Sequence, residues 1–217
     1  MSCFARRIVS GSNHTTERPD MSTASDPRPL YRDALAWVAS LIDEVRPEQM
    51  TDPTPCPEYD VRALLGHLVA TVDRGRVIGS DGDPLSVPEF LTGVPDDAWH
   101  AELERAQAHY RKVWSDDDLL DRPVVAPWGT VPGRAAVLSN LNEALVHGWD
   151  LAVATGLPAE PNPVLVEAAF VVARSKIPAS VRGGRVPFGA AVEPAPDASP
   201  VERLANWSGR DTAAWRR

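Results

Sequence analysis

The sequence has 217 residues, of which 43 % are apolar, and its formal net charge at pH 7 is −8 with neutral histidines. This length fits one ordinary domain with a small appendage, and the apolar fraction is enough to bury a core without disulfide bonds. The acidic balance, without any cluster of lysine and arginine, excludes the electrostatic footprint of a nucleic-acid-binding protein. No apolar run is long enough to span a membrane. Neither nucleic acids nor membranes are therefore expected partners.

Residues 1–25 are polar and show no apolar periodicity, so we expect a disordered tail or an over-extended start, with Met21 as an alternative first residue. Cys3 lies in this tail, and Cys56 is the only other cysteine in the sequence. A structural disulfide is therefore not expected, and a reducing compartment is the default for such a chain. The sequence predicts a cytoplasmic protein.

The apolar spacing after the tail is helical through most of the chain. We expect a first helix that begins at Asp26, which is followed by a proline, and that ends at Pro47. The proline-rich connector at 52–57 cannot be helical. Asp60 is placed to cap a second helix whose apolar residues fall within one arc of its surface. Glycine and proline residues then predict a loop over 79–95.

The middle of the chain predicts two more long helices. The third runs from Asp96 to about Trp114, with an acidic first turn that suits the helix dipole. A loop or short extended segment follows over 116–132. The fourth helix starts near Gly133, ends at Gly156, and is apolar on more than one face. This last pattern predicts that the fourth helix is buried in the middle of a bundle.

Beyond the fourth helix the elements become shorter. A fifth helix is expected from Asn162 to about Lys176, and Val186 to Val192 favour a short strand. Ser199 opens a last short helix with a capping box, and Gly209 ends it. Four long helices in one compact unit predict an all-α fold: an antiparallel four-helix bundle with extra C-terminal helices and a minor extended segment.

Three residues on the predicted second and fourth helices have side chains that bind metals, namely His67, Glu143 and His147. Glu143 and His147 are four residues apart, so they share a face opposite the apolar stripe of their helix, and Asp150 joins the same patch. Two imidazoles and one carboxylate on facing helices can hold a divalent cation and leave coordination positions open. The same spacing is also explained by a solvent-exposed Glu–His pair beside a histidine with a structural role, because Glu-x-x-x-His often occurs by chance. Spacing alone does not decide between these interpretations.

Two stretches resemble a known family. Residues 54–69, TPCPEYDVRALLGHLV, resemble the T-P-C-P-x-W-x-V-x-x-L-x-x-H segment of the DinB-like metal-binding helical bundles. They are most similar to the metal-binding domain of the mycothiol-dependent maleylpyruvate isomerase family and its actinobacterial relatives. Residues 142–156, NEALVHGWDLAVATG, are similar to the E-x-x-x-H-G-W-D-L-A-x-A-T-G block of the same family. The tail matches in outline, with Gly209-Arg210-Asp211 near its end, so the resemblance covers about residues 27–215.

The resemblance implies a divalent metal ion, expected to be zinc, that is bound by His67, Glu143 and His147. On this basis residues 26–160 form a metal-binding bundle, and residues 161–217 form a helical extension packed on it. The implied activity is that of a metal-dependent transferase or isomerase that acts on a small molecule with mycothiol as the thiol. The alternative is a non-catalytic metal-dependent ligand-binding or regulatory module, in which the ion only fixes the helix packing.

Two departures from the family and one cysteine affect how far that implied activity applies to this chain. Tyr59 stands where the family has tryptophan, and the isomerase has an additional C-terminal domain that this chain replaces with a short, different tail. Cys56 stands just before a helix N-terminus, where the helix dipole can lower a thiol pKa. A small residue between two prolines is also what the connector needs, and this second interpretation of Cys56 is preferred. An external thiol is then required for thiol chemistry.

Overall fold

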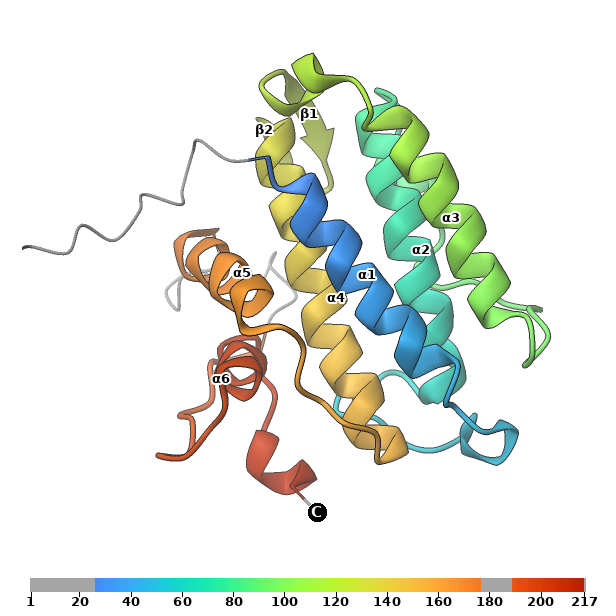
Figure 1. The fold of residues 1–217 in the computed structure, drawn as a ribbon, viewed down its shortest axis with the longest axis vertical. Helices are drawn as coiled ribbons and strands as arrows, with labels where there is room; N and C mark the ends of the chain where they lie inside the picture. The colour runs from blue at the N-terminus through green and yellow to red at the C-terminus, as the bar shows by residue number, and fades with distance from the viewer. Residues whose placement is uncertain (1–25, 177–188, 217) are drawn as a thin grey trace, which may run out of the picture.

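The computed structural model describes residues 26–176 and 189–216, and this part of the chain is mostly helical (Figure 1). The four long helices are α1 (Arg28–Ile42), α2 (Val61–Gly79), α3 (Trp99–Val113) and α4 (Gly133–Thr155). Two further helices, α5 (Pro163–Lys176) and α6 (Pro200–Trp207), contact α4 and each other. The all-α prediction of a four-helix bundle with extra C-terminal helices is confirmed. The predicted tail at 1–25 lies outside the described residues.

The helices of the bundle run in pairs. The start of α3 lies beside the start of α2, because Trp99 and Asp60 line one cavity. The ends of these two helices also meet, where the indole Nε1 of Trp114 donates to the carbonyl oxygen of Gly75 at 2.9 Å. Hence α2 and α3 are parallel, and α1 and α4 run the other way (Figure 1). A parallel pair needs a connection that returns along the bundle, and residues 80–98 form it.

Helix ends follow the local rules that the sequence predicts. The Asp60 carboxylate caps α2 by accepting from the backbone N–H of Ala63 at 2.8 Å. Ser199 and Glu202 form the predicted capping box of α6. Gly156 ends α4 with a φ of 73°, a left-handed conformation that glycine adopts without a steric penalty. These caps fix where the helices begin and end.

The first helix differs from its prediction at both ends. Pro27 occupies the N-cap position of α1, although the Asp26 carboxylate still accepts from the backbone N–H of Arg28 at 2.9 Å. The helix ends at Ile42 rather than at Pro47, which opens a separate 3-10 turn over Pro47–Gln49.

The small extended element lies in a different place from the predicted strand at Val186 to Val192. Residues 186–188 of that segment lie outside the described residues, and residues 189–192 have no strand conformation. The strands are β1 (Pro123–Ala126) and β2 (Gly129–Pro132), an antiparallel pair between α3 and α4 that lies within the loop or short extended segment predicted at 116–132. Val124 of β1 is buried, so this hairpin closes one end of the core.

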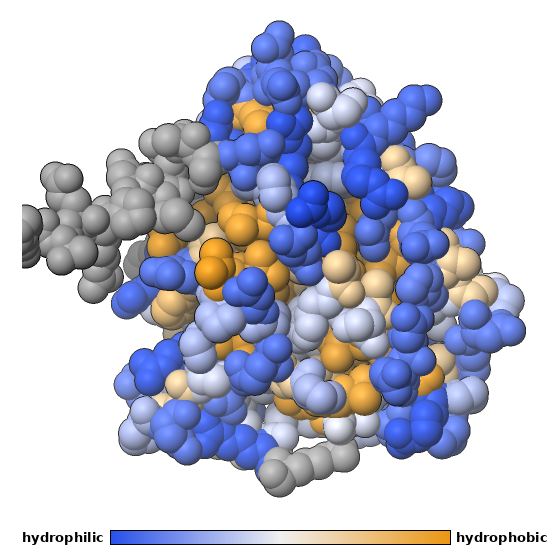
Figure 2. Space-filling view, in the orientation of Figure 1, coloured by the Kyte–Doolittle hydropathy of each residue, from blue (hydrophilic) through white to orange (hydrophobic). Residues whose placement is uncertain are grey.

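Helix α4 occupies the centre of the molecule, as its apolar pattern predicts. It contacts α1, α2, α5 and α6, and Leu141, Leu145 and Trp149 are buried. Hydrophilic residues cover most of the face shown in Figure 2, and apolar residues are visible between α1 and the helices that flank it. Among the described residues, no helix is long and apolar enough to cross a membrane. Because α4 is central and largely apolar, its buried polar side chains are the exceptions that need an explanation.

Candidate metal centre

The first histidine of the candidate site, His67, lies in the middle of α2 under a crossing segment of chain. This segment, residues 88–91, is called the strap here. The backbone N–H of Leu91 donates to the carbonyl oxygen of Gly66 at 3.2 Å, and Arg74 donates to the carbonyl oxygen of Pro88 at 2.9 Å. A Cβ atom on Gly66 would collide with the backbone of Leu91. Glycine at this position therefore lets the strap approach α2 beside His67.

The strap fixes the orientation of the His67 ring. Its Nδ1 lies 2.8 Å from the backbone carbonyl oxygen of Glu89 and 3.3 Å from the hydroxyl of Tyr59. That hydroxyl donates in turn to the Glu89 carboxylate at 2.7 Å. A carbonyl oxygen only accepts hydrogen bonds, so the hydrogen of the neutral ring is on Nδ1. The Nε2 atom of His67 is then left with a free lone pair.

The second histidine, His147, lies on α4 and faces His67. The two ring centroids are 4.7 Å apart, with an angle of 74° between the ring planes. The Nδ1 of His147 lies 3.0 Å from Oδ2 of Asp150, and its Nε2 lies 3.5 Å from Oε2 of Glu143. One ligand atom each from His67, Glu143 and His147 can be chosen so that all lie within 4.8 Å of one another. The structure therefore brings the three residues named as ligands together.

This arrangement fits a divalent cation. Both histidines have Nδ1 engaged by an oxygen acceptor, which leaves Nε2 of each ring as its available ligand atom, and Nε2 of His147 lies 3.5 Å from the Glu143 carboxylate. Histidine ligands of metals in proteins commonly have this second hydrogen bond, because it fixes the tautomer and the ring orientation. Two imidazole nitrogens and one carboxylate oxygen form a donor set that suits zinc and similar divalent ions.

Burial and charge give the three side chains different protonation states. Burial, followed by the charge of His147, lowers the pKa of His67 to about 4, so this ring is neutral at pH 7. Burial acts to lower the pKa of His147, but its hydrogen bonds to Asp150 and Glu143 raise it further than burial lowers it. Burial would raise the pKa of Glu143, but His147 outweighs that effect and the pKa is lowered. The hydrogen bonds to Asp150 and Glu143 thus favour the protonated form of His147, and a metal ion would compete with that proton.

Asp150 takes the position next to the ligands that its place in the sequence suggests. It is completely buried, with 0 % exposure, and contacts Nδ1 of His147 rather than joining the three grouped ligand atoms. Its other partner is the guanidinium of Arg210, at 2.8 Å from Oδ2. Sequence reasoning did not identify Arg210, Glu89 or Tyr59 as parts of the site. Arg210 belongs to the tail segment that matches the family in outline, whereas Glu89 acts mainly through its backbone and has no sequence signal.

Cys56 does not join the candidate site as a ligand. It is partly buried, and burial raises the pKa of its thiol, although the charge of Arg210 opposes this effect. Its carbonyl oxygen accepts from the hydroxyl of Thr54 at 3.0 Å, and that hydroxyl also donates to the carbonyl oxygen of Tyr59 at 2.8 Å. These bonds shape the connector before α2. They support the interpretation of Cys56 as a structural residue.

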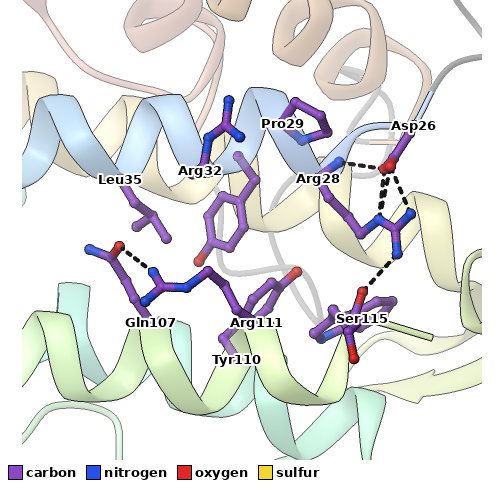
Figure 3. A pocket seen from close by; sticks show the side chains of 11 residues that line it. Asp26, Arg28, Pro29, Arg32, Leu35, Gln107, Tyr110, Arg111 and Ser115 are labelled. Carbon is purple, nitrogen blue, oxygen red and sulfur yellow. Dashed lines mark hydrogen bonds and ion pairs between the residues drawn. The ribbon is translucent and has the colours of Figure 1, made fainter. Parts of the chain in front are cut away.

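Two cavities lie apart from the three grouped residues. One, of about 260 Å³, lies between α1 and α3 and is lined by Arg28, Tyr110 and Arg111 among others (Figure 3). Arg28 is already engaged there by the Asp26 carboxylate. The other cavity, of about 220 Å³, is lined in part by Phe90 of the strap. His67, Glu143 and His147 line neither of them.

Comparison with known proteins identifies the family. Residues 31–152 match the family described as the mycothiol maleylpyruvate isomerase N-terminal domain. The chain belongs to this family. The matched range contains His67, Glu143, His147 and Asp150, but it ends before Arg210.

Curated relatives extend the similarity beyond the family domain. Two uncharacterized proteins from Mycobacterium tuberculosis, one from strain CDC 1551 / Oshkosh and one from strain ATCC 25618 / H37Rv, are each 29 % identical to this chain over 187 residues. The similarity covers 85 % of this chain and 98 % of each relative. No solved structure matches the chain significantly. An alignment of this length extends beyond the family domain into at least part of the C-terminal extension.

Proposed function

We propose that this protein binds one divalent cation, zinc in the first instance, through His67, Glu143 and His147. The observation that carries the proposal is the convergence of these three side chains, with ligand atoms within 4.8 Å of one another. They come from two antiparallel helices, each held by its own packing, so the donor set is largely formed before an ion arrives. We further propose that the bound ion serves reactions of a small-molecule thiol.

The chain's own residues prepare this site in two ways. The Glu89 carbonyl oxygen and the Asp150 carboxylate hold the Nδ1 atoms of His67 and His147, which leaves both Nε2 atoms available to a metal ion. Burial of His67 keeps its ring neutral, which is the form that ligates a metal. A divalent cation at this point would favour the thiolate form of a thiol over the thiol itself. Among the described residues only three ligands are grouped, which leaves room for an exogenous one.

An external thiol fits this chain better than an internal one. Burial raises the pKa of the Cys56 thiol, so little of it is thiolate near neutral pH. The family's printed description names mycothiol and maleylpyruvate isomerase, and we propose mycothiol as the co-substrate on that basis. The reaction class is then a mycothiol-dependent transfer or isomerization of a small molecule, in a cytoplasmic setting.

The alternative is a metal-dependent binding or regulatory module without catalysis. Such a module would need a closed shell of four protein ligands, because the ion only has to hold the helices together. The three-residue grouping favours the catalytic proposal over this alternative.

The proposal is tested first by elemental analysis of protein prepared without a histidine tag. We expect close to one divalent ion per chain, and we expect the His67→Ala, His147→Ala double variant to lose it. A double variant with the metal content of the wild type would overturn the ligand assignment. The metal-loaded protein is then titrated by calorimetry with mycothiol and with an analogue that lacks the thiol. Binding of mycothiol alone supports thiol chemistry, whereas equal binding of both compounds, or of neither, favours the non-catalytic module.

A further inference from the structure

The second partner of Asp150 comes from outside the bundle. Arg210 follows α6 in the C-terminal extension, yet its guanidinium reaches the buried carboxylate on α4. Its Nη2 lies 2.8 Å from Oδ2, and its Nε lies 3.1 Å from Oδ1. The same Oδ2 lies 3.0 Å from Nδ1 of His147. A continuous chain of charged hydrogen bonds therefore links the C-terminal extension to a residue of the proposed metal centre.

The backbone around Arg210 is shaped to deliver this side chain. Gly209 has a φ of 90°, which turns the chain back after α6. The backbone N–H of Arg210 then donates to the carbonyl oxygen of Ala205 at 3.0 Å. The carbonyl oxygen of Arg210 accepts from the side-chain amide of Asn206 at 2.9 Å. The arginine is thus anchored at both its main-chain groups.

The guanidinium of Arg210 is committed to protein partners. Besides the contacts of its Nε and Nη2 with Asp150, its Nη1 donates to the carbonyl oxygen of Ser208 at 3.3 Å. Its side chain is only 14 % exposed, while that of Asp150 is 0 % exposed. A carboxylate with no exposure is costly unless a cation and hydrogen bonds compensate it. Arg210 supplies that compensation, so it acts on the site through Asp150.

We propose that Arg210 is a positioning residue of the metal centre, and that residues 200–216 therefore contribute to this site. Arg210 holds the Asp150 carboxylate against Nδ1 of His147, which keeps the ring aimed and strengthens it as a ligand. This inference rests on the proposed metal site. Because coupling is reciprocal, metal binding also strengthens the docking of residues 200–216 on α4.

The test uses the full chain with cobalt(II), which reports its ligands spectroscopically. In wild-type protein each bound histidine should give a shifted ring N–H signal that exchanges slowly with water, because its Nδ1 is hydrogen-bonded. We expect Arg210→Met to weaken cobalt affinity by up to about 10-fold, the lower end of the effect of losing a direct partner of a ligand, because Arg210 acts through Asp150. The His147 signal should exchange faster, and the His67 signal, which depends on Glu89, should not change. A loss of fold stability alone would not discriminate between the two rings in this way.

Two further variants make the comparison specific. Arg203→Met is the matched control, because Arg203 is an exposed arginine of the same segment whose side chain donates to the main-chain oxygens of Ala198 and Pro196, away from Asp150. It should leave cobalt affinity and both signals unchanged. Arg210→Lys retains the charge but loses the two-pronged contact, so we expect only partial recovery of affinity. If Arg210→Met does not fold, Arg210→Lys and the wild-type exchange measurement still test the proposal.

That exchange measurement follows backbone amides of the wild type with and without metal. We expect the metal to slow exchange across residues 200–216. Unchanged exchange there, or unchanged cobalt affinity in a folded Arg210→Met, would overturn this inference and leave the proposed metal site intact. Failure of the wild type to bind cobalt or zinc would overturn the proposed function itself, and this inference with it.

Discussion

Replacement of Gly66 by alanine is a sharp perturbation, because this glycine lets the strap cross α2 beside His67. A Cβ atom there collides with the backbone of Leu91, which cannot rotate away as a side chain does. Alanine gains about 0.8–1 kcal/mol in helix propensity over glycine. Overpacking costs about 1–3 kcal/mol, and loss of the Leu91–Gly66 hydrogen bond costs about 0.5–1.5 kcal/mol. The two costs together outweigh the gain in helix propensity, so we expect net destabilisation of about 0.5–4 kcal/mol.

The consequence for the metal site is larger than the consequence for stability. A displaced strap takes the Glu89 carbonyl oxygen away from Nδ1 of His67, and such a loss weakens metal affinity about 10- to 100-fold. The assay is zinc or cobalt titration of the folded variant, alongside its chemical denaturation. Gly75→Ala is the control, because a Cβ there meets the side chains of Asn140 and Tyr110 and leaves the strap untouched. If Gly66→Ala and Gly75→Ala lose similar stability and both retain full metal affinity, the role assigned to the strap is wrong.

Three further predictions follow from other parts of the structure. Metal affinity should weaken as the pH falls through the raised pKa of His147, because a proton and the ion compete for this ring, and titrations at several pH values measure the effect. Removal of the ion by a chelator should lower the melting temperature, since an ion at 100 times its Kd stabilises the fold by about 2.7 kcal/mol. Cys56 should react with iodoacetamide more slowly than a small free thiol at neutral pH, because burial raises its pKa, and peptide mapping follows its modification. A fast reaction at Cys56 would contradict its structural role.

The helices and their caps were accessible from the sequence because they depend on local chemistry. Asp60, Ser199 and Gly156 each act within one helical turn, and each is found in its predicted role. The directions of the helices were not accessible in the same way. The predicted antiparallel arrangement holds for α1 and α4 against α2 and α3, but apolar periodicity is identical for a helix that runs up or down, so nothing in the spacing predicted that α2 and α3 are parallel to each other. A parallel pair requires a long connection between α2 and α3. The predicted loop at 79–95 is compatible with such a connection but did not indicate the directions of the two helices.

The candidate site likewise contains residues that the sequence predicted and contacts that it did not. The ligand set of His67, Glu143 and His147 was named from motifs, and the structure brings these residues together, while their binding of a metal stays a prediction. The Glu89 contact uses a backbone carbonyl oxygen, which every residue has, so no residue type could have signalled it. Arg210 is one arginine among many in an arginine-rich sequence. Only the three-dimensional structure pairs it with Asp150, which is 60 positions away.

The position of Arg210 also bears on where this protein's functional unit ends. The family match stops at residue 152, only two residues after Asp150, so it includes the buried acid but not the arginine that compensates it. A chain cut at that boundary would leave the Asp150 carboxylate facing His147 alone, once the cover supplied by the C-terminal segment is removed. Water would then reach Asp150, and the acid would no longer be held against Nδ1 of the ring. In the proposed metal site, the C-terminal extension is therefore a contributor through Arg210 rather than an appendage of the bundle.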